Sequence, residues 1–113
     1  MNQSTCLFCK IASGEVPSKK VFEDERIFAF EDINPQAPTH ILVIPKKHFQ
    51  DMHEGAQDPG LLGDILARSA SIARERGIPE YRLVSNSGGI AGQAVFHLHF
   101  HVLGGRRMGW PPG

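Results

Sequence analysis

Short apolar segments separated by proline and glycine divide the chain into predicted strands and helices. Residues 40–44 form an apolar, β-branched run that ends at Pro45, which is typical of a buried strand. Residues 34–38 contain two prolines and predict a loop. Further strands are expected over residues 20–23, 26–31, 81–85 and 95–103. Five strands without alternating βαβ units predict an α+β fold with an antiparallel sheet.

One long helix is predicted between Asp58 and Gly77. Asp58 suits the N-cap, and Pro59 suits the first turn, where its missing N–H costs nothing. Apolar or small residues at steps of three and four form one stripe of Leu62, Ile65, Leu66, Ser69, Ile72 and Ala73. A shorter helix is expected over residues 7–13, ending near Gly14.

Three histidines alternate with apolar residues in the last predicted strand. A strand places His97, His99 and His101 on one face, about 6–7 Å apart, and the intervening apolar residues on the other. A face that only meets solvent would be served equally well by threonine, lysine or glutamate. The pattern therefore indicates function, either as metal ligands or as a nucleophile with an acid or base.

Composition limits the classes of partner. The chain has 113 residues, with twelve Lys and Arg against twelve Asp and Glu. This length fits one domain, and zero net charge argues against nucleic acid or an anionic membrane as partner. The start of the chain shows no signal peptide, and no run approaches the roughly 18–20 apolar residues that cross a bilayer. We therefore expect a cytoplasmic protein.

A glycine-rich turn over residues 86–93 leads directly into the histidine strand. Glycine lets backbone N–H groups approach an anion closely, although a plain turn is the commoner meaning of such a segment. Next to three aligned imidazoles, the turn favours phosphate as the electrophile.

The segment GQAVFHLHFHVLGGR, residues 92–106, resembles the signature of the histidine triad (HIT) nucleotide-binding family. The segments FEDINPQAPTH (30–40) and VIPKKH (43–48) match as well, and the tail RMGWPPG (107–113) resembles the Hint branch, the purine nucleoside phosphoramidases. The likeness extends from about Leu7 to the end. It implies a single HIT domain over residues 1–113, with one long and one short helix and with sheets joined across a homodimer.

The resemblance also implies a reaction. His99 would attack the α-phosphorus of a purine nucleoside 5′-phosphoramidate, expel the amine and form a nucleotidyl-histidine that water hydrolyses. His101 would donate to phosphate oxygens, and the backbone of His97 would orient the ring of His99. No cofactor is expected to take part in this chemistry. The resemblance assigns contacts with the phosphate to Asn86, Gly92 and Gln93, and it also counts Gln93 among the catalytic residues.

The nucleoside would lie between an acidic and an apolar group of residues. Asp32 would accept hydrogen bonds from the ribose hydroxyls, although it could instead cap the following turn. An adenosine monophosphate-like base would contact Leu7, Phe8, Ile11, Val16, Phe30 and Ile33. The Hint branch often has serine near the leaving group where this chain has Ala94, so protonation of the departing amine is the step most affected.

Cys6 and Cys9, with His48 and His97, make a Cys₂His₂ set that suits a structural zinc ion. Some bacterial triad proteins similarly combine the two cysteines with these histidine positions. The alternative is a pair of half-buried thiols on a helix. His40 is expected near the nucleotide side of the sheet and His53 on the surface, neither with a special role.

The tail, residues 104–113, carries Trp110 followed by Pro-Pro-Gly. An exposed indole at a terminus is costly, which suggests docking, and the Hint resemblance implies docking near the partner's site. Three other functions remain open. They are a non-catalytic, zinc-stabilised nucleotide-binding or scaffold protein, a zinc hydrolase using His97 and His99, and a dinucleoside polyphosphate hydrolase of another HIT branch, which the Hint-like tail weakens.

Overall fold

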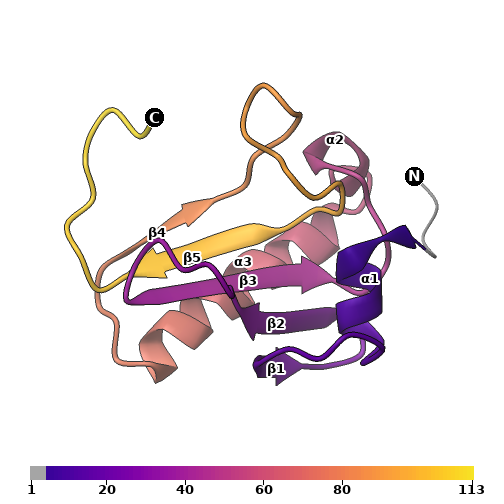
Figure 1. Cartoon of the computed structure of the whole chain (residues 1–113), viewed down its shortest axis with the longest axis horizontal. Helices are drawn as coiled ribbons and strands as arrows, with labels where there is room; N and C mark the ends of the chain where they lie inside the picture. The colour runs from indigo at the N-terminus through magenta and orange to yellow at the C-terminus, as the bar shows by residue number, and fades with distance from the viewer. Residues whose placement is uncertain (1–4) are drawn as a thin grey trace.

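The computed structural model describes residues 5–113, which form one five-stranded antiparallel sheet with helices on it (Figure 1). The strands lie in the order β1-β2-β3-β5-β4. Along the chain the elements are α1 (Leu7–Ala12), β1 (Lys20–Glu23), β2 (Ile27–Glu31), β3 (Thr39–Pro45), α2 (Met52–Gly55), α3 (Pro59–Glu75), β4 (Tyr81–Val84) and β5 (Phe100–Gly104). The predicted α+β class and the five-stranded antiparallel sheet are confirmed.

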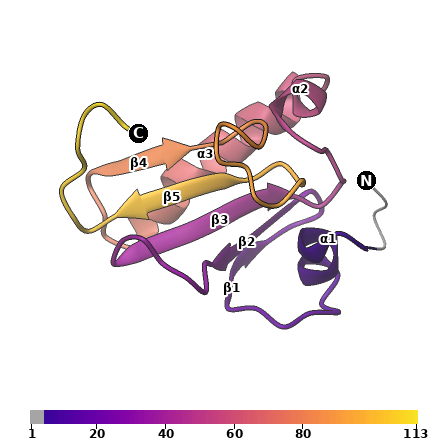
Figure 2. The same ribbon diagram turned by 45° about the horizontal axis from the view of Figure 1, so that its top comes forward.

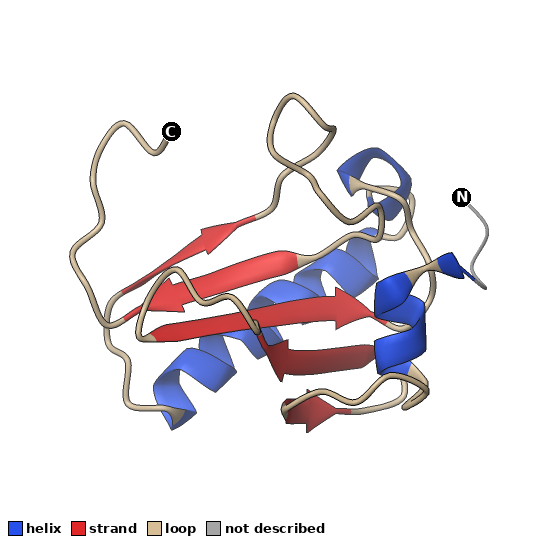
Figure 3. Ribbon diagram, viewed as in Figure 1, coloured by secondary structure: helices blue, strands red, loops and turns tan. Residues whose placement is uncertain are grey.

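Helix α3 covers one face of the sheet (Figure 3). Asp58 caps it, since its Oδ1 accepts a hydrogen bond from the Leu61 N–H at 3.1 Å. The buried face of α3 is rotated slightly from the predicted stripe, since it includes Leu61 and leaves Leu66 44% exposed. The buried positions are Leu61, Ile65, Ser69, Ile72 and Ala73. No helix within residues 5–113 is long and apolar enough to span a membrane.

Helix α1 packs against the opposite face, near the end of β3 (Figure 2). Successive residues of β2 show the division: Ile27 and Ala29 belong to the α3 side, whereas Phe28 and Phe30 belong to the α1 side. The α1 side is built by Cys6, Phe8, Ile11, Phe28, Phe30, Leu42 and Ile44. Residues 27–30 of β2 and 41–45 of β3 are buried on both faces, and they are apolar without the alternation of a half-exposed strand.

Strand β5 is shorter than predicted, since it begins at Phe100 instead of residue 95. Its ladder with β3 starts where Phe100 faces Val43, and two residues later Pro45 has no N–H to offer a partner. Leu98 bonds instead to the loop after β3, where its N–H donates to the Phe49 carbonyl at 2.7 Å. Residues 97–99 are therefore held by tertiary contacts and not by the sheet ladder.

The short helix α2 was not predicted. Its N-cap Asp51 accepts a hydrogen bond from the Glu54 N–H at 3.1 Å, and the Glu54 carboxylate accepts one from the Gln50 N–H. This reciprocal pair is close to a capping box, whose Asp-x-x-Glu spacing is the sequence signal that would have located the helix.

Candidate active site

The histidines share one side of the chain even though β5 begins late. Leu98, Phe100 and Val102 lie in the cluster under α3, whereas the rings of His97 and His99 both contact Phe8 of α1, at centroid distances of 6.0 and 5.0 Å. The rings of His99 and His101 are 5.0 Å apart, closer than a regular strand predicts. The predicted division into a histidine face and an apolar face is therefore correct.

His99 is held as a neutral imidazole with one accessible lone pair. Its Nδ1 lies 2.7 Å from the carbonyl oxygen of His97, and because a carbonyl only accepts, Nδ1 carries the hydrogen. Burial lowers the pKa of His99, so the ring stays neutral at pH 7. Within residues 5–113, Nε2 has no hydrogen-bond partner, and it is not fully buried. The geometry thus prepares Nε2 as a nucleophile or base.

His101 belongs to a chain of three polar side chains that includes His40, which sequence reasoning placed nearby but gave no role. His101 Nδ1 lies 2.9 Å from His40 Nε2, and His40 Nε2 lies 3.4 Å from Asp32 Oδ2. The ladder explains the contact, since Leu42 of β3 faces His101 and His40 precedes it by two residues. The only signal in the sequence was a histidine within an otherwise apolar, buried strand.

The buried side chains of His40 and His101 predict that the folded state loses stability in acid. Burial, with smaller effects of His99 and His40, lowers the pKa of His101 to about 4, and burial also lowers that of His40. Histidine in an unfolded chain titrates near about 6.5, so between pH 6.5 and 4 the unfolded chain binds protons that the folded chain does not. The free energy of unfolding is therefore expected to fall as the pH drops through this window.

Urea denaturation at a series of pH values, with chelator present throughout, measures this slope. His101→Asn is expected to flatten it, whereas the same change at exposed His53 on α2 leaves it unaltered. An unchanged slope in His101→Asn contradicts the assignment.

The glycine-rich turn is braced by Gln93, which is buried. Its side-chain amide donates to the carbonyls of Gln50 at 2.7 Å and Val95 at 3.1 Å, and its Oε1 accepts from the Gly88 N–H at 2.8 Å. The Gly92 N–H also donates within the turn, to the Gly89 carbonyl at 3.0 Å. A phosphate contact from Gln93 or Gly92 would therefore exchange one of these hydrogen bonds. Asn86 is half-buried beside Gly92, and Ala94 is exposed.

The residues expected around the nucleoside divide by exposure. Phe8, Ile11 and Phe30 are buried in the α1-side cluster, and Val16 packs at its edge. Three others are open to solvent, with exposed fractions of 47% for Leu7, 97% for Ile33 and 84% for Trp110. Asp32 caps the following turn, which was the alternative to a ribose contact, since its Oδ1 accepts a hydrogen bond from the Asn34 N–H at 2.8 Å.

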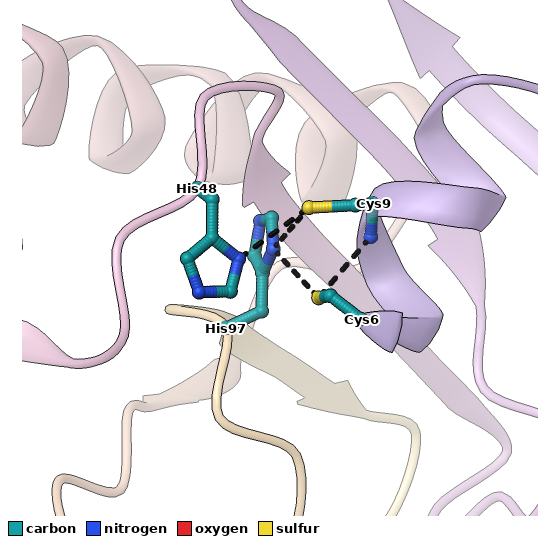
Figure 4. Close-up of side chains that lie close together, drawn as sticks. All are labelled: Cys6, Cys9, His48 and His97. Carbon is teal, nitrogen blue, oxygen red and sulfur yellow. Dashed lines mark hydrogen bonds between the residues drawn. The ribbon is translucent and has the colours of Figure 1, made fainter. Parts of the chain in front are cut away.

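The four predicted metal ligands converge at one place, between α1, the loop after β3 and residues 97–99 (Figure 4). One ligand atom from each residue lies within 4.8 Å of the others. The Nδ1 atom of His97 is 3.3 Å from Cys6 Sγ, and that of His48 is 3.4 Å from Cys9 Sγ. His97 Nε2 donates to the Pro45 carbonyl at 2.8 Å, so Nδ1 presents its lone pair to the thiols. Burial and the neighbouring Cys6 thiol raise the pKa of Cys9 to about 11. This donor set fits tetrahedral zinc.

Comparison with known proteins identifies the family. Residues 13–108 match the family model described as HIT domain. The chain belongs to the HIT family. A HIT family hydrolase from Legionella pneumophila is 54% identical and superposes with a TM-score of 0.93, covering 96% of this chain and all of that one. A 14 kDa zinc-binding protein of Zea mays is 44% identical over 100% of this chain and 91% of its own.

A third relative is a nucleotide-binding protein by its name. A histidine triad nucleotide-binding protein from Candida albicans is 36% identical, with a TM-score of 0.81, and is matched over 95% of this chain and 83% of that one. This HIT protein therefore has the fold of HIT hydrolases and nucleotide-binding proteins. Its four Cys and His side chains could hold a metal ion, and the maize relative is named for binding zinc.

Proposed function

We propose that this HIT protein is a phosphoramidase of the Hint branch, which cleaves the P–N bond of purine nucleoside 5′-phosphoramidates. The observation that carries the proposal is the state of His99. Its Nδ1–H is tied to the His97 carbonyl at 2.7 Å, so a neutral ring offers the Nε2 lone pair beside the ring of His101. A nucleophilic histidine needs this combination of fixed tautomer and accessible nitrogen.

The reaction then has two displacements at phosphorus. His99 Nε2 forms a bond to the α-phosphorus while the P–N bond breaks, and the amine leaves with its electron pair and takes up a proton. In the second step, the oxygen of water forms a bond to the phosphorus and loses a proton to solvent, while the bond from phosphorus to His99 Nε2 breaks. The electron pair returns to Nε2, and the nucleoside monophosphate is released. His101 donates a hydrogen bond to the phosphate oxygens in both steps and thereby stabilises the charge that develops there.

Binding of the substrate uses the surroundings of this pair. Asp32 accepts hydrogen bonds from the ribose hydroxyls, since its side chain is 20% exposed and reaches solvent. The base lies against an apolar side formed by Leu7, Phe8, Ile11, Val16, Phe30 and Ile33. The phosphate side is formed by Asn86, Gly92, Gln93 and Ala94. No broad positive surface is needed for one nucleotide.

A structural zinc ion is part of the proposal. The ion would be held by Cys6, Cys9, His48 and His97. It would stiffen the contact between α1 and residues 97–99 without entering the reaction. The Nδ1 atom of His97 faces these thiols, whereas its carbonyl orients His99, so the metal cluster and the nucleophile meet in one residue.

The protein is also proposed to act as a homodimer. Strand β4 lies at the edge of the sheet, and an unpaired edge favours pairing with another strand. The tail follows β5 and contacts this edge strand, because the Arg82 guanidinium donates to the Gly109 carbonyl at 2.7 Å. Joining two sheets through β4 would carry Trp110 and the rest of the tail toward the partner's site.

Trapping the intermediate tests the proposed reaction. Protein mixed with adenosine phosphoramidate and quenched in acid is expected to carry one adenylyl group on His99, located by mass spectrometry of its peptides. The attachment follows because Nε2 is the only unpartnered nitrogen of that ring within residues 5–113. Release of the amine without any adduct, or with the adduct on another residue, contradicts the proposed route.

One observation favours a second candidate, a zinc-stabilised nucleotide-binding protein without catalysis. Ala94 supplies no hydroxyl near the leaving group. This candidate predicts that adenosine monophosphate binds while the phosphoramidate persists unchanged, so the same quenched samples distinguish the two.

A further inference from the structure

The loop before β3 is connected to the catalytic histidines by a chain of hydrogen bonds. The backbone N–H of Gln36 donates to His40 Nδ1 at 3.0 Å, and His40 Nε2 lies 2.9 Å from His101 Nδ1. The backbone of Gln36 is held at a second atom, because Arg106 Nε donates to the Gln36 carbonyl at 2.8 Å. Arg106, which sequence analysis gave no role, thus helps to fix the first donor in place.

The donors and acceptors in this chain allow only one arrangement of protons in neutral rings. A backbone N–H can only donate, so His40 Nδ1 accepts and the ring hydrogen of His40 lies on Nε2. That hydrogen points at His101 Nδ1, which must accept in turn. The ring hydrogen of His101 therefore lies on Nε2, an atom without a partner among residues 5–113.

We propose that the Gln36 amide and the His40 ring are positioning groups that lock His101 in the Nε2–H form. His101 then presents a hydrogen-bond donor toward the phosphate, and not a competing lone pair. The His97 carbonyl locks the adjacent His99 in the opposite form, with its hydrogen on Nδ1. Two rings 5.0 Å apart are thus prepared for opposite tasks before any ligand arrives.

A metal ion held by Asp32, His40 and His101 is the competing interpretation, since their ligand atoms lie within 4.8 Å of one another. Such an ion would need a lone pair on His40 Nε2, which moves the ring hydrogen to Nδ1. The Gln36 N–H already points at that atom, so two hydrogens would face each other. Asp32 Oδ2 lies 3.4 Å from His40 Nε2, where its negative charge favours the hydrogen that this nitrogen carries.

Long-range ¹H–¹⁵N NMR of the histidine side chains tests the proposal directly in the unmodified protein. At neutral pH, His101 and His40 are expected with protonated Nε2 and bare Nδ1, and His99 with the reverse. A His101 ring protonated on Nδ1, or averaged between the two forms, overturns the proposal. The consequence for turnover rests on the proposed function, but this spectrum does not, so either idea can fail alone.

Two replacements of His40 separate positioning from packing. His40→Gln keeps an amide donor that can reach His101 Nδ1, whereas His40→Leu fills the site without one. In His40→Leu we expect His101 to populate both tautomers, and the rate of nucleotidyl transfer to fall about tenfold, as for other groups that orient a functional side chain. Affinity for adenosine monophosphate should change less than the rate.

His40→Gln should retain the His101 tautomer and most of the rate. His53→Leu, at an exposed position on α2, serves as the matched control and should change neither. If His101 keeps its Nε2–H form in His40→Leu, the relay is wrong. Should that variant not fold, the spectrum of the unmodified protein still decides.

Discussion

Replacement of His99 by alanine is expected to lower phosphoramidate hydrolysis by about 10⁴-fold or more, the scale on which loss of a nucleophile acts in other covalent enzymes. No neighbour can take over the attack. His97 is fully buried with Nε2 bonded to the Pro45 carbonyl, and the lone pair of His101 is occupied by His40. Steady-state release of the amine from adenosine phosphoramidate measures the change, and the quenched variant should carry no adenylyl group.

Controls show whether the loss is chemical. His99→Ala should still bind adenosine monophosphate in calorimetry, because the residues assigned to the base and ribose are untouched. It should also unfold in a single cooperative transition. His53→Ala removes the same side chain from an exposed position and should keep full turnover. Hydrolysis by His99→Ala within about tenfold of the unmodified rate would rule out a covalent route through this residue.

Much of the fold followed from local patterns. Asp58 and Pro59 predict the start of α3, and its apolar stripe predicts the face that packs on the sheet. The run before Pro45 predicts β3, whose residues are buried on both sides. These features depend on neighbours in the chain, which a single sequence contains.

The start of β5 and the role of His40 could not be predicted in the same way. The first depends on Pro45, more than fifty residues away in sequence, which ends the ladder that β5 would otherwise continue. The second depends on the register that brings β3 beside β5, so that His40 reaches His101. Alternation predicts which face a histidine takes, but only the pairing of strands decides which group it meets.

The candidate metal cluster was predictable in its residues but not in its connection to the nucleophile. The spacing of Cys6 and Cys9, together with the resemblance to bacterial triad proteins, predicted the four residues that the folded chain brings together. That the ring of His97 faces both thiols while its carbonyl accepts the hydrogen of His99 requires the folded chain. We therefore expect loss of order at the cluster to affect the orientation of His99 through this one residue.

Zinc is therefore expected to bind as one ion per chain and to raise the melting temperature by at least about 10 °C. An ion present at a thousand times its dissociation constant stabilises the folded state by about 4 kcal/mol. One kcal/mol shifts the midpoint of a small domain by roughly 4–8 °C. Elemental analysis and thermal unfolding, with zinc added or removed by chelator, measure both quantities.

Cys6→Ser is the informative variant for this prediction. Cys6 caps α1 by accepting the Cys9 N–H at 3.4 Å, and serine preserves that cap while removing one thiolate. The variant should therefore keep the stability of the metal-free protein but lose most of the zinc-dependent rise, whereas exposed His53→Ala should keep the rise. Chelated protein, assayed well below its melting temperature, should still form the His99 adduct, because the ion stiffens the site and takes no part in the displacement. Abolished adduct formation in folded, metal-free protein would instead make zinc part of the chemistry.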